Sequence, residues 1–153
     1  MTKVAKSLRI LVLADTHDQL PEAIEALAAG VDEIWHLGDV CVPAILKTLR
    51  EFGPPVTIVR GNCDSEEQWP LVVNLERQGV RFRLEHIPSE QDLRDADVLL
   101  HGHTHVPRDE KHGAVRFLNP GCVTRPNRGA PASVAHLEIA ADGVLRWTLT
   151  RLR

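Results

Sequence analysis

Residue types that bind metal ions follow four short apolar runs of this sequence. The four segments are Asp15-Thr16-His17, Gly38-Asp39, Gly61-Asn62 and Gly102-His103-Thr104-His105. Carboxylate, carboxamide and imidazole groups together suit borderline divalent ions such as manganese, iron, zinc, nickel or cobalt. Ions held in this way polarise a substrate and activate water. The pattern therefore predicts a metal centre.

The spacing of the candidates supports this prediction. Asp15 and His17 are two residues apart, as are His103 and His105. In extended backbone, side chains two apart lie on the same side, so each pair can reach one cluster of ions. Glycines at 38, 61 and 102 come directly before candidates and allow sharp turns and close backbone approach.

Strands must deliver these residues to one place. We predict strands at 8–13, 33–37 and 56–60 with helices at 20–29 and 42–52, which is the alternation of a sheet that begins parallel. The carboxyl ends of parallel strands form the ligand-binding edge of such a sheet. Further along we predict a hairpin of strands 71–77 and 80–86, a short helix from Ser89 to about Asp97, strands 98–101 and 114–118, and a hairpin of 133–139 with 144–150.

The prediction is thus an α/β fold, a two-sheet β-sandwich flanked by helices, in one domain covering 1–153. Two of its aspartates also admit a purely structural interpretation. Asp15 and Asp39 each precede a predicted helix and could act as its N-terminal cap.

Composition excludes several classes of protein. A net charge of −3 argues against a stable nucleic-acid binder, and no apolar run approaches the roughly 20 residues of a membrane helix. Three cysteines without a Cys-x-x-Cys pair argue against a disulfide framework and against a structural or storage zinc site. The first residues lack the features of a signal peptide, so we expect a cytoplasmic protein.

The blocks DTHD, HLGDV, VRGNCD and HGHTH, followed by Asn119-Pro120-Gly121-Cys122, resemble the calcineurin-like metallophosphoesterase superfamily. The resemblance is to its small prokaryotic YfcE-type phosphodiesterase branch, and it extends over 8–150. It implies a four-layer αββα architecture, which is the metallophosphoesterase arrangement of the sandwich predicted above. It also implies hydrolysis of a phosphorylated small-molecule or nucleotide-like substrate.

The resemblance also implies a set of ligands for two divalent ions, with manganese as first choice. Asp15, His17 and His105 would hold the first ion and Asp39 would bridge both. The second ion would be held by Asn62, His86 and His103. A hydroxide bridging the two ions would be the nucleophile, and Asp39 and Asn62 are expected to take part in catalysis.

The sequence departs from the family at two places. The family usually has His-Gly-His where this chain reads His86-Ile87-Pro88, so His86 is expected to be a ligand while the loop after it is altered. Cys63 follows Asn62 where phosphomonoesterases of the family often have a histidine that protonates the leaving oxygen. This favours a phosphodiesterase over a phosphomonoesterase and leaves the general acid unassigned.

Arg125 or Arg128, in the loop after the Asn119 block, is expected to contact phosphate oxygens. Cys63, Asp64 and His101 are expected to lie directly behind the ligands. Asp64 could equally orient Asn62 or act as an acid.

For the remaining polar residues we expect structural roles. His36 should be a hydrogen-bonded structural residue, while Cys41 and Cys122 should be small core residues. A homo-oligomer is possible through the C-terminal sheet edges. The alternative of another class is a protein-interaction scaffold like the retromer subunit of this superfamily, which has lost ligand positions.

Overall fold

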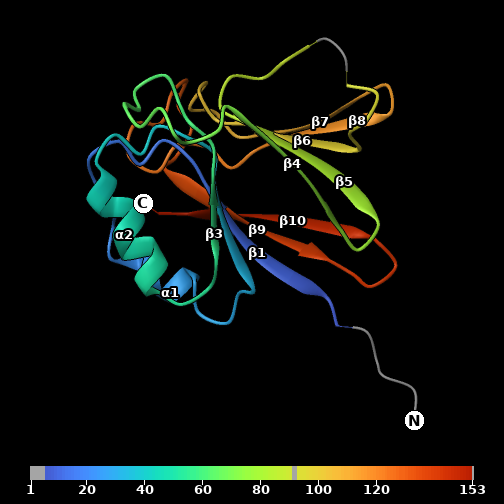
Figure 1. The fold of residues 1–153 in the computed structure, drawn as a ribbon, viewed down its shortest axis with the longest axis horizontal. Helices are drawn as coiled ribbons and strands as arrows, with labels where there is room; N and C mark the ends of the chain where they lie inside the picture. The colour runs from blue at the N-terminus through green and yellow to red at the C-terminus, as the bar shows by residue number, and fades with distance from the viewer. Residues whose placement is uncertain (1–5, 91–92, 153) are drawn as a thin grey trace.

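Two five-stranded sheets pack face to face in the computed structural model, which describes residues 6–90 and 93–152 (Figure 1). The first sheet has the strand order β10-β9-β1-β2-β3. These strands are β1 (Leu8–Leu13), β2 (Glu33–His36), β3 (Val56–Ile58), β9 (Ser133–Ile139) and β10 (Leu145–Arg151). β1, β2 and β3 are parallel, β9 pairs antiparallel with β1, and β10 pairs antiparallel with β9 at the edge of the sheet.

The second sheet has the order β4-β5-β6-β8-β7. Its strands are β4 (Val72–Arg77), β5 (Val80–Glu85), β6 (Val98–Leu100), β7 (Arg108–His112) and β8 (Val115–Asn119). β5, β6 and β8 run parallel in its centre, and antiparallel β4 and β7 form its edges. Each sheet therefore has a parallel core whose strand ends meet at one edge.

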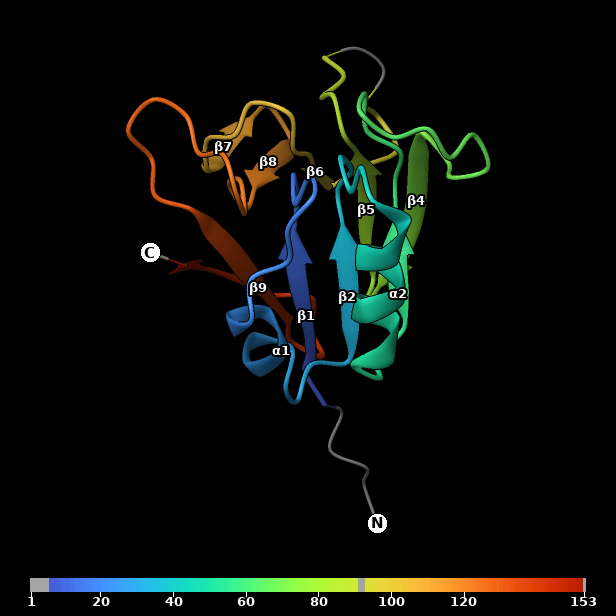
Figure 2. The ribbon, with the colours of Figure 1, turned by 90° about the vertical axis from the view of Figure 1, so that its left-hand side faces the viewer.

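Alternation along β1 shows why the sheets pack as they do. Ile10 and Val12 face the second sheet and pack with buried residues that include Trp35 and Phe82. The intervening Leu11 and Leu13 face outward. They are covered by α1 (Ala23–Leu27) and α2 (Pro43–Glu51), which lie in front of β1 and β2 in Figure 2. One strand thus joins two hydrophobic layers.

The predicted two-sheet sandwich with flanking helices is confirmed, and the parallel start of the first sheet is as expected. The first predicted helix is shorter than 20–29 and spans only Ala23–Leu27. Neither described helix has a side-chain hydrogen bond at its N-cap, so the interpretation of Asp15 and Asp39 as helix caps is wrong. In the described chain no helix is long and apolar enough to span a membrane.

Two predictions for the second sheet were wrong. The helix expected at 89–97 is absent from its described part, which is irregular, and residues 91–92 lie outside the described ranges. The hydroxyl and amide of Ser89 both donate to the Glu85 carboxylate, so the hydroxyl does not cap a helix. The edge strand β7 was not predicted because its sequence, RDEKH, is charged throughout and mostly exposed.

Phe82 tests the packing between the sheets. Its ring meets that of Trp35 edge to face at 5.3 Å, and both side chains are buried. We expect Phe82→Ala to lower the free energy of unfolding by about 3–5 kcal/mol, measured by urea denaturation, because it leaves a cavity at the centre of the sandwich. Phe82→Leu keeps most of the volume and should cost less than about 1.5 kcal/mol. Equal losses for the two variants would contradict this role.

Candidate metal centre

The predicted ligands lie in loops at one edge of the sandwich. Loops after β1, β2 and β3 carry Asp15, His17, Asp39 and Asn62, while loops after β5 and β6 carry His86, His103 and His105. In Figure 2 these loops meet along the upper edge, where both sheets end. The site therefore spans the boundary between the two sheets.

The spacing argument assumed extended backbone at this edge, but the backbone there is not extended. Most of the described non-glycine residues with positive φ lie here: Asp15, His17, Asp39, Cys41, His103 and His105, with φ between 51° and 73°. The left-handed conformation disfavours side chains with a Cβ atom, and such strain is concentrated at functional sites. Both members of each pair do reach the cluster, but through tight turns rather than through strand geometry.

The first half of the cluster contains Asp15, His17, Asp39 and His105. One ligand atom from each of these residues lies within 4.8 Å of those of the other three. His105 Nε2 is 3.4 Å from Asp15 Oδ1, and the rings of His17 and His105 meet edge to face at 5.4 Å. These four side chains were predicted to share the first ion.

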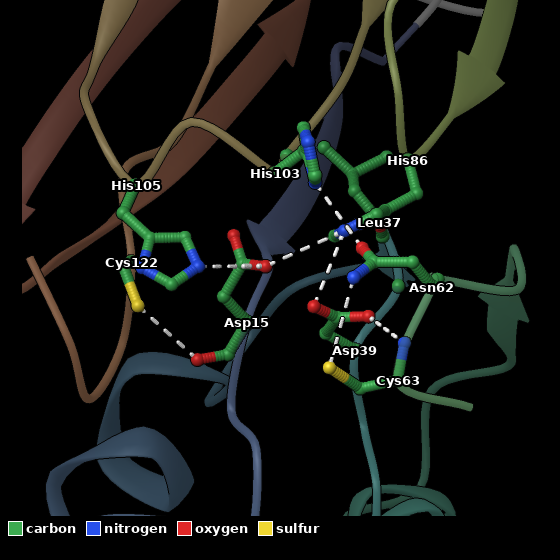
Figure 3. Close-up of polar contacts among 12 residues, drawn as sticks. Asp15, Leu37, Asp39, Asn62, Cys63, His86, His103, His105 and Cys122 are labelled. Atoms are coloured by element: carbon green, nitrogen blue, oxygen red, sulfur yellow. Dashed lines mark hydrogen bonds and ion pairs between the residues drawn. The ribbon is translucent and has the colours of Figure 1, made fainter.

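The second half contains Asp39, Asn62, His86 and His103. His86 Nε2 lies 3.3 Å from Asp39 Oδ2 and 3.8 Å from Asp15 Oδ1, so His86 contacts both carboxylates (Figure 3). His103 Nδ1 is 3.1 Å from Asn62 Oδ1, and the rings of His86 and His103 are 5.2 Å apart. All seven predicted side chains therefore converge.

Hydrogen bonds fix the orientation of the imidazoles. The Nδ1–H of His86 donates to the Leu37 carbonyl at 2.8 Å and that of His105 to the Arg125 carbonyl at 2.7 Å. Each ring therefore turns its Nε2 toward Asp15. Metal-binding histidines in proteins usually donate their second N–H in this way.

The buried polar atoms of this cluster fit a cation. Among the residues that the structure describes, neither oxygen of Asp15 has a hydrogen-bond partner, and neither does Nε2 of His17 or of His86. Asp15 is fully buried. Buried polar and charged atoms are normally paired or bound to metal, and these four atoms are donors of the required kinds pointing at one another.

Burial raises the pKa of Asp15 to about 6, and the nearby imidazoles of His86 and His105 offset this only in part. For Asp39, burial also disfavours the charged form, but the His86 imidazole 3.3 Å away and a hydrogen bond from the Cys63 amide lower its pKa to about 2. Asp39 is thus readily ionised, whereas burial disfavours the charge of Asp15, and a cation beside it would stabilise that charge.

Asp64 ties the loops of the first sheet together. Its Oδ2 accepts hydrogen bonds from the amides of Asp39 at 2.9 Å and Gly61 at 2.7 Å, and its Oδ1 accepts one from the amide of Cys41 at 2.8 Å. Asp64 thus positions the backbone around Asp39 instead of contacting the ligand side chains. Within the described ranges, Asp64 accepts no hydrogen bond from the Asn62 side chain.

Two glycines are required for clearance. A Cβ on Gly61 would lie 2.1 Å from Asp39 Oδ1, and one on Gly38 would lie 2.8 Å from His86 Nδ1, at a φ of 99°. Any side chain at either position would displace a predicted ligand. Glycine before these candidates is explained by this crowding as well as by the turn.

Other histidines support the loops from behind. His36 is buried, accepts a hydrogen bond from the Gly38 amide and donates to the Thr16 hydroxyl, which is the structural role predicted for it. Its burial lowers its pKa to about 3. His101 is also buried, donates to the Gly102 carbonyl and accepts from Arg108.

Asn119 supports the same turn as His101. Its amide group donates to the Gly102 carbonyl and the Thr104 hydroxyl, while its carbonyl accepts from the Gly121 amide. The block that begins at Asn119 therefore braces the loop that carries His103 and His105.

The two predicted arginines lie in different surroundings from each other. Arg125 is exposed, and its positive charge lies close enough to His17 to lower the pKa of that imidazole further, after burial. Arg128 and His103 both line a groove of about 510 Å³. Asn62 and His86 line a second groove of about 470 Å³.

Sequence reasoning missed the contacts of two cysteines. Cys41 was expected in the core, but it is only half-buried and its Sγ lies 3.5 Å from His17 Nδ1. Cys122 is buried as expected, yet its thiol donates to the Asp15 carbonyl. Only the position of Cys41, two residues after Asp39, hinted at a role.

Asp64 can be tested through metal affinity. In Asp64→Asn the amide group faces backbone N–H donors, so at least one of the three hydrogen bonds is lost. We expect manganese affinity to fall by about 10–100-fold in calorimetric titration. Asp142→Asn, in the exposed turn before β10, is the matched control and should bind as the unaltered protein does. Equal affinity of Asp64→Asn and the control would show that Asp64 does not position the centre.

Comparison with known proteins identifies relatives of this chain. Residues 8–142 match the model of the calcineurin-like phosphoesterase superfamily domain. The phosphodiesterase YfcE of Escherichia coli strain K12 is 33% identical over an alignment of 164 positions, gaps included, which covers 86% of this chain and 88% of YfcE.

Solved structures show the same fold. That of YfcE, described as a phosphoesterase from E. coli, superposes with a TM-score of 0.73 at 27% identity, covering 95% of this chain and 100% of the other. A single-residue mutant of Vps29 from Entamoeba histolytica superposes with a TM-score of 0.76 at 23% identity, again over 95% and 100% of the two chains. From the matched domain and the similarity to YfcE, the chain belongs to the calcineurin-like phosphoesterase superfamily.

Proposed function

We propose that this protein hydrolyses phosphodiesters with two divalent cations held by Asp15, His17, Asp39, Asn62, His86, His103 and His105. The observation that carries the proposal is the orientation of the imidazoles. His86 and His105 each satisfy Nδ1 with a backbone carbonyl and turn Nε2 toward the buried Asp15 carboxylate. Such an arrangement is stable only with positive charge at its centre.

The donor set favours manganese, with iron, zinc, nickel or cobalt as alternatives. All seven donors are oxygen or nitrogen atoms, and no thiolate is among them. Two ions at such a site would supply an activated water as the nucleophile and would neutralise charge on the phosphoryl oxygens.

Apart from Asp39, different residues would bind the two ions. Asp39 lies between the two halves of the cluster, within reach of His17 on one side and His86 on the other, and would bridge the ions. Asn62 accepts a hydrogen bond from His103 and would bind the second ion through the same oxygen. The Asp64 hydrogen bonds hold the Asp39 and Gly61 backbone in place throughout.

A diester suits the surroundings of the cluster. The groove that Asn62 and His86 line has a mostly apolar surface. Its other lining residues include Leu71, Val72, Ile87 and Arg60. The groove that His103 lines also contains Arg128 and Arg108, of which Arg108 is ion-paired with Glu110. A phosphodiester has two substituents on phosphorus, and each groove can take one of them.

Cys63 also favours diesters. It occupies the position where a histidine would protonate a poor leaving group, and burial and the nearby Asp39 raise the pKa of its thiol. A thiol held protonated in this way is a weak acid near neutral pH. Diesters with easily released alcohols or phenols need less help from such a group than monoesters do.

Hydrolysis of a chromogenic diester and of the matching monoester tests the activity. With manganese we expect the diester to be the better substrate, and with a chelator we expect both rates to fall to background. Asp39→Asn should lower kcat/KM by about 100-fold or more, because the bridging carboxylate is lost. Asp142→Asn is the matched control. An undiminished rate with chelator would overturn the metal-dependent mechanism. No hydrolysis of either ester with manganese would overturn the proposal and favour a scaffold.

Metal content tests the dinuclear centre separately. His86→Ala removes a predicted ligand of the second ion only, so bound manganese should fall from about two ions per chain to about one in elemental analysis. His112→Ala is the control, since His112 is exposed and contacts only Glu110 and Phe117 among its described partners. Unchanged metal content in His86→Ala would show that His86 is not a ligand.

A further inference from the structure

Two thiols and an imidazole form a second cluster beside the metal centre. One ligand atom each from His17, Cys41 and Cys63 lies within 4.8 Å of the other two. The Sγ of Cys41 is 3.5 Å from Nδ1 of His17. In a tetrahedral zinc site, with bonds of about 2.3 Å to sulfur and about 2.0–2.1 Å to nitrogen, neighbouring S and N atoms are also about 3.5 Å apart.

Backbone hydrogen bonds hold the two thiols in place. The Cys41 amide donates to Oδ1 of Asp64, whose other oxygen binds the loop before Cys63 through the Gly61 amide. The Cys63 amide donates to Asp39 Oδ1 at 2.8 Å (Figure 3). The two cysteines come from loops after different strands, and these bonds order both loops before any ion arrives.

The thiol cluster is open to solvent. Cys63 is exposed and Cys41 is half-buried, whereas Cys122, the third cysteine, is fully buried. Asp39 and Asp64 add negative charge around the two thiols. An ion from solution can therefore reach the pair, and the local field attracts cations.

His17 belongs to both clusters, and this limits what it can do. Its Nε2 is buried without a hydrogen-bond partner in the described chain, and the ring lies beside Asp15 and His105. Its Nδ1 faces Cys41. A neutral imidazole has one unprotonated nitrogen, so it can coordinate an ion on one side at a time.

We propose that His17, Cys41 and Cys63 form a site for a thiophilic divalent cation such as Cd²⁺ or Zn²⁺, and that its occupation displaces the first catalytic ion. The two thiols lose their protons to solvent as they bind the ion. Nδ1 of His17 binds the same ion as the two thiolates, so the proton of the ring moves to Nε2. Protonated Nε2 cannot then bind an ion in the catalytic cluster. The displacement rests on the proposed function, while the thiolate site does not.

Cadmium titration of the purified protein tests the site directly. Cadmium bound to thiolates absorbs in the ultraviolet, and we expect this band to saturate at about one equivalent. Cys41→Ser and Cys63→Ser should each abolish at least half of the band. Cys122→Ser is the matched control and should retain it. A band that persists in both single variants, or that is lost only in Cys122→Ser, would overturn the site.

Competition with manganese tests the displacement. Free Mn²⁺ is counted by its electron paramagnetic resonance signal while one equivalent of Cd²⁺ is added. We expect manganese affinity to fall by about 10-fold or more for one ion, and not to fall in Cys41→Ser and Cys63→Ser. Serine can still accept the hydrogen bond of His17, so these variants should bind manganese.

The outcomes separate the two proposals. If cadmium displaces manganese equally well in the serine variants, it acts at the catalytic cluster and the displacement through His17 is wrong. If manganese never binds while the thiolate band forms, the proposed function fails and the thiolate site stands.

Discussion

The structure depends on an anion placed where water cannot reach it. Asp15 is fully buried at the end of β1, and within the described ranges neither of its oxygens accepts a hydrogen bond. A buried carboxylate costs several kcal/mol unless neighbouring groups compensate its charge, and here the imidazoles of His86 and His105 lie beside it. The inward Nε2 atoms of His86 and His105 follow from this requirement.

The loops meet the requirement through strained but well-supported backbone. Left-handed residues at Asp15, Asp39 and His103 would each be unfavourable alone. The Asp64 carboxylate holds the turn at Asp39, and the Asn119 side chain holds the turn at His103. Because Gly61 leaves no room for a Cβ beside Asp39, the geometry tolerates little adjustment. Rigid strands and short turns together make a preorganised cluster.

Much of this was predictable, and the exceptions have physical causes. β1, β2 and β5 were found from apolar patterning. Six of the seven ligand candidates followed from residue types at strand ends, while His86 was added from the family resemblance. The charged edge strand β7 has no apolar alternation to detect. The role of Asp64 depends on three backbone amides brought together only by the fold, and the contact of Cys41 with His17 is likewise tertiary. Residue types reveal donors, but not which backbone groups they meet.

The position of the cluster at the boundary between the sheets has a thermodynamic consequence. Asp15 and Asp39 follow strands of one sheet, whereas His86 and His103 follow strands of the other. Ions that bridge them would act as a reversible cross-link between the halves of the sandwich, present only in the folded state. Resistance to heat would then grow with the logarithm of the free-ion concentration, so supply of the ion would govern the lifetime of the protein as well as its turnover.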